Sequence, residues 1–366
     1  FKEHLAIQIR MSPAELSEFR ERKHVVILAN HPDRQDPFIV AQLAKFANED
    51  LNVIVAREVF DWDWGWRGWL LQSLGCYSVS RGRADFRSIA STAKIIKEGQ
   101  HKLVVFPEGE ITSDEEVVHE VQKAIFHIML DVQKELSEKS IEDSVIVIPM
   151  AIKFSLETDL SSSVESVLKK IEGEMGIAGA EQSIDVFARI NLIIQTYLQT
   201  VINAYDLQWS KKSNLEGLAE LAAVEILQKI AAQYALSYDV AAPPCEQLYK
   251  IRNGLGERIE SDSVALRQEF HCGGVPKPCL RSDLERVERL LILHRSLEQP
   301  KSEMQACRNL DFIESELFGK ITPKGRQKAY VNFGASIEVS DYLELYKESK
   351  EGAIDKLTSL YKKRMQ

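Results

Sequence analysis

The feature that most constrains the fold of this chain is a regular alternation of short apolar runs with helical patterns over residues 1–154. The apolar runs that predict strands are residues 24–29, 51–56, 75–80, 102–106 and 145–154. The helical patterns between them are residues 37–48, 86–97, which Gly99 ends, and 116–139. Short strands that alternate with helices favour an α/β layer with a mostly parallel sheet.

The pattern changes after this region. Residues 155–328 show little strand signal, and apolar side chains recur at helical spacing within residues 184–198 and 215–230. Ser282-Asp283-Leu284-Glu285 matches a capping box that opens a further helix, which Pro300 closes. This part of the chain is therefore expected to be all-helical.

A strand signal returns at residues 329–333. A chain of 366 residues also exceeds the usual size of one hydrophobic core, which favours two domains or one domain with a large insertion. We predict an α/β core at residues 1–154, a helical insertion at 155–328, and the last core strand with a C-terminal helix at 329–366.

Composition excludes several classes of protein. The hydrophobic share of 45% and the charged share of 28% are typical of a globular chain. A net charge of −9 argues against a nucleic-acid partner, which would require a basic surface. Five cysteines without a Cys-x-x-Cys spacing favour reduced thiols in the cytoplasm. No apolar run approaches the roughly 18 residues that a membrane span needs.

The first candidate site is the turn between residues 24–29 and the helix that follows. His31 stands at the end of the predicted strand, and Asp36 stands five residues later at the helix start. An imidazole that a carboxylate orients is what a general base requires. The alternative is that Asp36 is an ordinary helix N-cap followed by Pro37 at the first helical position.

A second candidate follows the strand at residues 102–106. Glu108 and Gly109 stand where ligands bind to parallel sheets, and a glycine permits close approach of the backbone. The alternative is a turn with solvated glutamates. Arg81 and Arg83 follow the strand at 75–80, where their guanidinium groups could bind a phosphate. Their alternative is a surface charge cluster.

Four of the five tryptophans fall within residues 62–69. An indole has an apolar body and a polar tip, so it favours membrane interfaces and partner contacts. Core packing explains one or two such residues more readily than four. The cluster therefore predicts either an interface or part of the core.

Taken in order, these motifs resemble the glycerolipid acyltransferase family, which includes lysophosphatidic acid and glycerol-3-phosphate acyltransferases. The resemblance covers residues 1–154 and about 329–345. Its matching segments are Asn30, His31 and Asp36; Gly75 to Arg81; Phe106-Pro107-Glu108-Gly109; Val147-Ile148-Pro149-Met150-Ala151; and Gly334 to Ile337.

The resemblance implies transfer of a fatty acyl group from a thioester, either acyl-CoA or acyl carrier protein, to a hydroxyl of a lyso-lipid such as 1-acylglycerol-3-phosphate. His31 would be the general base and Asp36 would hold its tautomer. No metal or organic cofactor is implied. The residues expected to bind substrate are Asn30, Arg81, Arg83, Glu108 and Gly109.

Two features depart from the family. Glu110 and Ile111 replace the usual threonine and arginine of the third motif, and a carboxylate there would repel a phosphate. The helical insertion is not assigned by the resemblance. Because the expected substrates are lipids, we expect a cytoplasmic protein that binds the membrane surface peripherally through residues 62–71.

Two other functions remain open at this point. A metal-dependent hydrolase could draw ligands from the acidic and histidine residues near the first and third motifs. A non-catalytic relative could use the tryptophan cluster and the helical insertion as faces that bind a membrane or a carrier. The ligands in the first case would be His31, Asp33, Asp36, Glu108 and His119.

Overall fold

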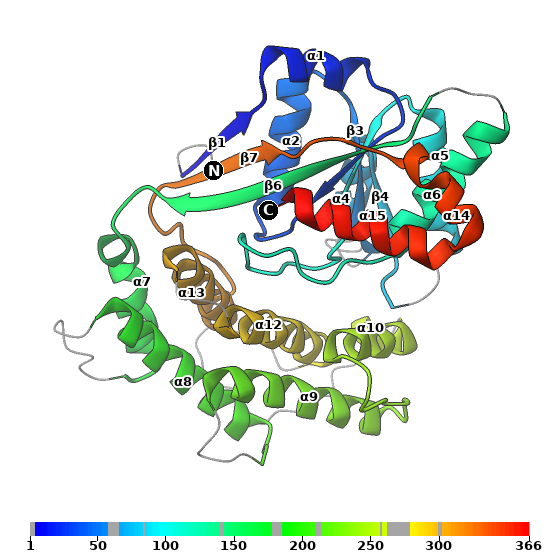
Figure 1. Cartoon of the computed structure of the whole chain (residues 1–366). Helices are drawn as coiled ribbons and strands as arrows, with labels where there is room; N and C mark the ends of the chain where they lie inside the picture. Colours follow the sequence, from blue (N-terminus) through cyan, green and yellow to red (C-terminus); the bar gives the residue numbers. More distant parts are fainter. Residues whose placement is uncertain are drawn as a thin grey trace. The chain divides into compact units, whose positions relative to one another are not determined.

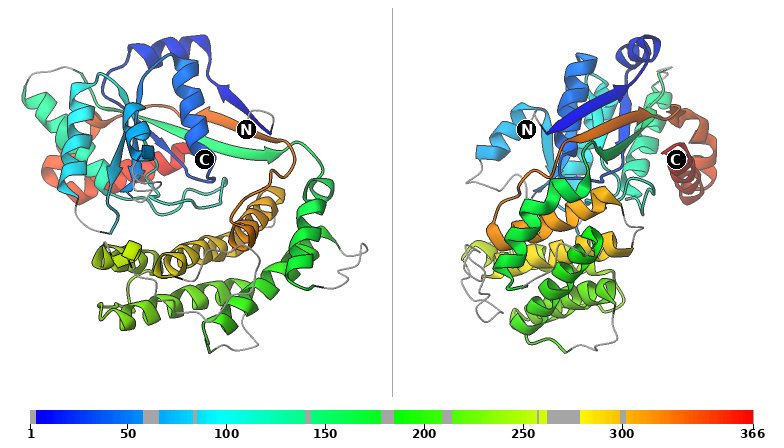
Figure 2. Two further views of the ribbon diagram at one scale, coloured as in Figure 1. Left: turned by 180° about the vertical axis from the view of Figure 1, so that it is seen from behind. Right: turned by 90° about the vertical axis from the view of Figure 1, so that its left-hand side faces the viewer.

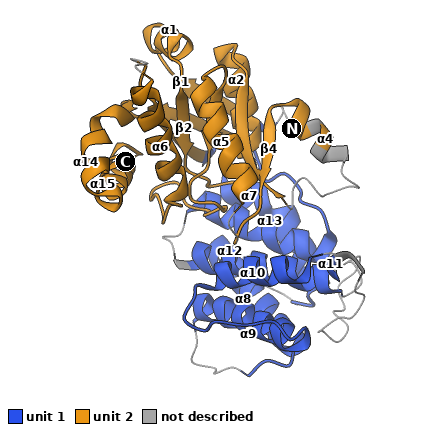
Figure 3. Cartoon of the chain, turned by 90° about the vertical axis from the view of Figure 1, so that its right-hand side faces the viewer, with its two compact units in different colours: residues 1–5, 155–327 blue, residues 6–154, 328–366 orange. Residues whose placement is uncertain are grey.

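The computed structural model describes residues 4–57, 66–82, 85–139, 143–177, 185–208, 214–256, 258–261, 279–298 and 302–365. The chain divides into two compact units (Figure 3). The helical unit consists of Phe1–Leu5 and Ser155–Gln327, and the α/β unit consists of Ala6–Phe154 and Lys328–Gln366. All of the segments that carry the family resemblance belong to the α/β unit.

The α/β unit is built on a mixed, mostly parallel sheet. Its path runs β1-β7-β6-β2-β5-β3-β4, and β8 pairs with β6 in antiparallel fashion. The central strand β2 is parallel to both β5 and β6, and β3 is parallel to both β4 and β5. The strands are β1 Leu5–Arg10, β2 Val25–Ala29, β3 Leu51–Ala56, β4 Cys76–Val79, β5 Lys102–Val105, β6 Ile146–Leu156, β7 Gln327–Phe333 and β8 Ile337–Glu338.

Helices cover both faces of this sheet (Figures 1 and 2). Val26 and Leu28 of β2 join an apolar cluster with α5, α6 and α15, whereas Val25 and Ile27 point to the other face, which α2 covers. The helices are α1 Pro13–Glu21, α2 Asp36–Ala47, α4 Trp66–Ser73, α5 Phe86–Glu98, α6 Ala124–Glu138, the 3₁₀ helix η2 Val339–Tyr342, α14 Leu343–Glu348 and α15 Lys350–Met365. The expected α/β fold class is confirmed.

The predicted strands from residue 24 to residue 154 are all present, with ends that differ by one or two residues. Helix α5 also forms as expected: the Asp85 carboxylate accepts from the Ser88 backbone at its start, and Gly99 closes it in the left-handed conformation. Strand β1 was not predicted. Helix α1 was also not predicted, although Ser12 and Glu15 form a capping box at its start.

The prediction of a long helix at residues 116–139 was wrong over its first third, because α6 begins only at Ala124. The preceding segment is a loop whose backbone N–H groups bond to carboxylates and a carbonyl outside it. The Asp114 carboxylate accepts from Glu116 N, the Glu108 carboxylate accepts from His119 N, and Pro107 O accepts from Gln122 N. Such bonds compete with the helical ladder.

The helical unit contains a single large apolar cluster in its described residues. The predicted stripes are confirmed in the described residues, since α8 and α9 bury most of the apolar residues at those spacings, and Ile184 lies outside the described residues. The predicted capping box was wrong: α12 begins at Leu280, so Ser282 lies in its first turn and accepts from Cys279 N. The helices are α7 Leu160–Glu174, α8 Val186–Ala204, α9 Leu215–Gln233, α10 Pro244–Leu255, α11 Arg258–Ser261, α12 Leu280–Glu298 and α13 Glu303–Phe318.

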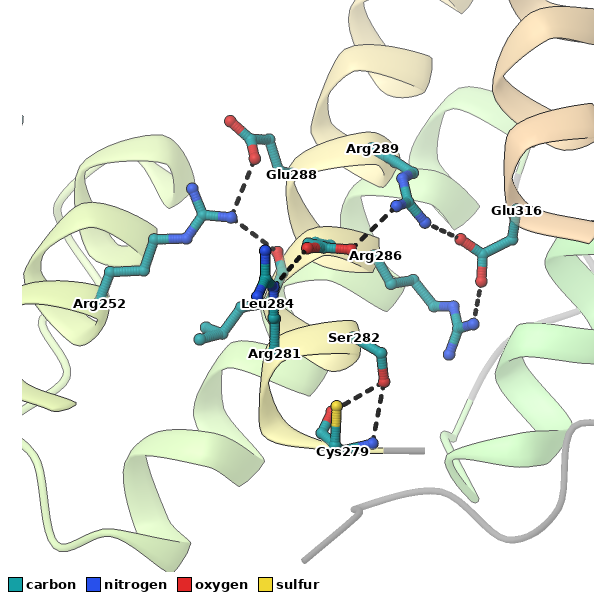
Figure 4. A network of polar contacts seen from close by, with 10 residues as sticks. Arg252, Cys279, Arg281, Ser282, Leu284, Arg286, Glu288, Arg289 and Glu316 are labelled. Carbon is teal, nitrogen blue, oxygen red and sulfur yellow. Dashed lines mark hydrogen bonds and ion pairs between the residues drawn. The ribbon is translucent and has the colours of Figure 1, made fainter. Parts of the chain in front are cut away.

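A network of charged residues also lies in the interior of this unit (Figure 4). Arg286 of α12 and Glu316 of α13 form an ion pair and are both buried, and Arg289 contacts the same carboxylate. Arg286 also donates to the Tyr205 hydroxyl, 2.8 Å away, which donates in turn to Asp283. Removing one partner of a buried ion pair leaves an uncompensated charge, so this network restricts how the helices pair.

Candidate active site

Three turns carry the candidate residues, and each follows a strand of the parallel part of the sheet. His31 follows β2, Glu108 follows β5 and Arg81 follows β4. The pairing of β2 with β5 places Leu28 opposite Val105, so the first two turns leave the sheet side by side. The carboxyl edge of a parallel sheet is where α/β proteins bind ligands.

His31 and Asp36 form a direct pair. His31 Nδ1 lies 2.7 Å from Asp36 Oδ2, the same oxygen that accepts from Asp33 N at 3.1 Å. The His31 ring stacks on Phe106 with 4.4 Å between ring centroids, and it remains partly exposed while Asp36 is fully buried. The bond to Asp36 assigns the Nδ1–H tautomer, so Nε2 is the basic nitrogen.

The environment of Asp36 is unfavourable for a charge. Burial raises the pKa of this carboxyl to about 6, against the opposing hydrogen bond from His31. Its second oxygen, Oδ1, is buried and has no hydrogen-bond partner in the described structure. Asp36 is not a helix cap: the N-cap of α2 is Gln35, and no side chain caps that helix end. The N-cap interpretation was therefore wrong.

Glu108 joins two parts of the site. One carboxylate oxygen, Oε2, accepts from His31 N at 2.9 Å, and the other, Oε1, accepts from His119 N at 2.9 Å. The residue is 3% exposed, and burial raises the pKa of its carboxyl, opposed by these two hydrogen bonds. Both oxygens thus bind backbone, and the substrate-binding role expected for Glu108 stays a prediction.

Arg81 lies against the same loop as Glu108. Its Nη1 donates to Gly109 O at 3.2 Å, which brings the ends of β4 and β5 together. Gly109 has a φ of +76°, a conformation that favours glycine. The phosphate-binding role of Arg81 and the role of Gly109 toward substrate stay predictions. Arg83, the second arginine, lies outside the described residues.

Asn30 connects two strands beyond their ladder. Its Nδ2 donates to Ile152 O at 3.0 Å, and its Oδ1 accepts from Ile152 N at 2.7 Å. The side chain is buried, so this amide fixes the end of β2, and therefore the start of the His31 turn, against β6. Its expected contact with substrate is untested.

Sequence reasoning missed the role of a second histidine and its carboxylate. His119 Nε2 lies 3.0 Å from Asp114 Oδ2, and Asp114 is 4% exposed whereas His119 is 32% exposed. Burial favours the neutral acid, yet bonds from His119 and from backbone N–H groups lower the pKa of Asp114. The spacing Asp-x4-His, the reverse of His31-x4-Asp36, is the signal that could have shown this pair.

The five ligands of the metal-dependent hydrolase do not gather at one point. Within the described ranges, no group of three or more His, Cys, Asp or Glu side chains could hold a metal ion. Glu108 binds two backbone N–H groups, while Asp36 and Asp114 each pair with a different histidine. The hydrolase therefore has no ligand set in this part of the chain.

The tryptophan cluster is described only in part. Helix α4 includes Trp69, whose side chain is 71% exposed, so this residue is not part of the core. The remainder of the predicted contact at residues 62–71 lies mostly outside the described residues. Among the helices that the structure describes, none is long and apolar enough to cross a membrane.

The comparison with protein families agrees with this arrangement. Residues 13–153 match the model of the family described as Acyltransferase, and this range contains every candidate site residue discussed above but not the segment Gly334 to Ile337. No curated protein matches the chain. Residues 13–153 are therefore a domain of the acyltransferase family, and acyl transfer is the chemistry that this domain supports.

Proposed function

We propose that this protein is an O-acyltransferase that moves a fatty acyl group from a thioester, acyl-CoA or acyl carrier protein, to a hydroxyl of a lyso-glycerophospholipid such as 1-acylglycerol-3-phosphate. The observation that carries the proposal is the 2.7 Å contact between His31 and Asp36 at the carboxyl edge of the sheet. This contact lies inside the acyltransferase-family domain.

His31 acts as the general base in this reaction. Its Nε2 takes the proton of the acceptor hydroxyl as that oxygen attacks the thioester carbonyl, forming a C–O bond. The tetrahedral intermediate then collapses, the C–S bond breaks, and the imidazolium returns the proton to the departing sulfur. Asp36 holds the Nδ1–H tautomer and stabilises the imidazolium that forms between these steps.

Two charged side chains near the site, those of Arg81 and Glu110, bear on the choice of acceptor. Arg81 supports a phosphate-bearing acceptor, because its guanidinium lies beside the turn that carries Glu108. Glu110, one residue after Gly109, adds a carboxylate to the same turn and opposes a phosphate. An acceptor whose phosphate is esterified, and carries one charge instead of two, would meet less repulsion there.

We further propose that the protein acts at the cytoplasmic surface of a membrane, as its lipid substrates require. Trp69 supports this, since an exposed indole partitions into the headgroup region. Leu74 and Phe86, which follow α4 and begin α5, are 64% and 77% exposed and would add apolar contact.

The test is a transfer assay with a panel of acceptors. The protein is incubated with a labelled acyl thioester of CoA or of acyl carrier protein, and with lyso-lipids that carry phosphate, choline, glycerol or no headgroup. The products are identified by mass spectrometry. A diacyl product from at least one lyso-glycerophospholipid is expected. Release of free fatty acid alone, with no transfer to any acceptor, would refute the proposal.

Chelator treatment of the same reaction separates the rival chemistry. The general-base mechanism draws on imidazole and carboxylate groups, so transfer should persist in the presence of excess chelator. Loss of activity that added divalent metal restores would favour the metal-dependent hydrolase instead.

A further inference from the structure

The backbone of His31 is held at both of its polar groups. Its N–H donates to Glu108 Oε2, as described above, and its carbonyl oxygen accepts from Thr112 N at 2.9 Å. The Thr112 hydroxyl lies 3.4 Å from the same carbonyl. Both restraints come from the segment that follows β5, so the position of His31 depends on the conformation of that segment.

These restraints form a closed ring of hydrogen bonds. The Glu108 carboxylate also accepts from His119 N, and the His119 ring bonds to the Asp114 carboxylate. Asp114 N in turn donates to the Thr112 hydroxyl at 3.5 Å. Thr112 N then returns to His31 O. Because one carboxylate joins two bonds of 2.9 Å, the backbone nitrogens of His31 and His119 are at most about 8 Å apart.

Asp114 and His119 form the only side-chain-to-side-chain bond in this ring. The Asp114 carboxylate also accepts from Glu116 N and Val117 N at 2.8 and 3.3 Å, so it is the fixed member of the pair. The bond between the two side chains sets the separation of Thr112 and His119 along the loop. Those two residues supply the N–H groups that reach His31 and Glu108.

We propose that Asp114 and His119 are positioning residues for the general base, and that they act on His31 through Thr112 and Glu108. The proposal rests on the proposed function, since it needs His31 to be the base. Without the hydrogen bond between Asp114 and His119, the loop is no longer held in this conformation and the His31 backbone shifts. A displacement of about 1 Å lowers turnover by about 100-fold, because the base no longer meets the acceptor hydroxyl correctly.

The chain offers a matched pair of variants at this position. In His119→Gln the amide nitrogen stands where Nε2 stood, so the bond to Asp114 is retained. In His119→Asn the amide is one carbon shorter and does not reach that carboxylate. His127→Ala replaces an exposed histidine of α6, eight residues further along the chain, and is the control for loss of a nearby histidine.

The experiment measures kcat and KM for acyl transfer by the whole protein, per folded molecule as judged by thermal unfolding. We expect His119→Asn to lower kcat by about 100-fold with KM within about twofold, whereas His119→Gln and His127→Ala keep kcat within about fivefold. Wild-type kcat in His119→Asn would overturn the inference. A loss of equal size in the Gln and Asn variants, or a loss confined to KM, would also overturn it.

His31→Ala in the same assay separates this inference from the proposed function. If the wild-type protein transfers no acyl group, the proposed function fails; if His31→Ala retains wild-type turnover, the general-base role of His31 fails, and the positioning role with it, whatever the His119 variants do. If His31→Ala abolishes turnover while His119→Asn leaves kcat unchanged, only the positioning role fails. His119→Asn and His119→Gln differ by one methylene, so comparing the two stays informative even when both unfold at a lower temperature.

Discussion

Asp36→Asn should make this protein more stable and nearly inactive. The substitution keeps the shape of the side chain and an oxygen that accepts from His31 and from Asp33 N. It removes a carboxylate that is fully buried and has one oxygen without a hydrogen-bond partner in the described structure. A buried charge that is incompletely paired destabilises the folded state, and this charge is retained for the reaction.

The size of the effect follows from the pKa of Asp36. Burial raises it from 3.8 to about 6, and about two pKa units correspond to at most about 3 kcal/mol. Because the folded protein binds this proton more tightly than the unfolded chain does, the wild type loses that stability as the pH rises through 4 to 6. The variant has no carboxyl to titrate at this position and avoids the loss.

Denaturant unfolding at pH 4, 6 and 8 measures the difference directly. The free energy of unfolding of Asp36→Asn, minus that of the wild type, should rise with pH and gain up to about 3 kcal/mol by pH 8. Turnover should fall by about 10³-fold or more, because a neutral amide does not stabilise the imidazolium that forms on His31. Asp50→Asn, at an exposed residue directly before β3, should neither raise stability nor lower turnover. A variant that is less stable than the wild type at pH 8 would refute the reasoning.

Three other substitutions test separate parts of the account. Glu108→Gln turns an amide NH₂ toward a backbone N–H. The loss of that hydrogen bond should lower the free energy of unfolding by about 1–3 kcal/mol and should also lower kcat. Unchanged thermal unfolding would contradict the two hydrogen bonds of Glu108. Gly109→Ala and Gly176→Ala both place alanine at positive φ and should each cost about 1–2 kcal/mol, but only the first should lower turnover. Trp69→Ser should reduce co-sedimentation with anionic lipid vesicles. Val240→Ser, which changes an exposed residue of the helical unit, should not reduce it. Equal binding by both variants would show that Trp69 is not part of the membrane contact.

The central strands of the α/β unit were predictable because β2, β5 and the first half of β6 are buried on both faces. Residues Val25–Ala29 of β2 are all buried, and such strands appear in the sequence as continuous apolar runs. The pairing of His31 with Asp36 was predictable for a related reason. A histidine at a strand end and a carboxylate at the next helix start are brought together by the turn between them.

The segment after β5 was not predictable in the same way. Residues 116–123 have a helical pattern, but Asp114 and Glu108 take their backbone N–H groups and hold the segment as a loop. No local signal in the sequence shows that both carboxylate oxygens of Glu108 accept from backbone N–H groups. The outcome depends on contacts between residues far apart in the chain, namely His31 with Glu108 and with Thr112.

The central claim is that His31 removes the proton of the acceptor hydroxyl. The most direct measurement is the rate of transfer from labelled acyl thioester to the lyso-lipid acceptor, compared between wild type and His31→Ala at pH 8. We predict a rate lower by about 10²- to 10⁴-fold in the variant, which still folds and still binds the acceptor. A folded His31→Ala protein that transfers the acyl group at the wild-type rate would contradict it.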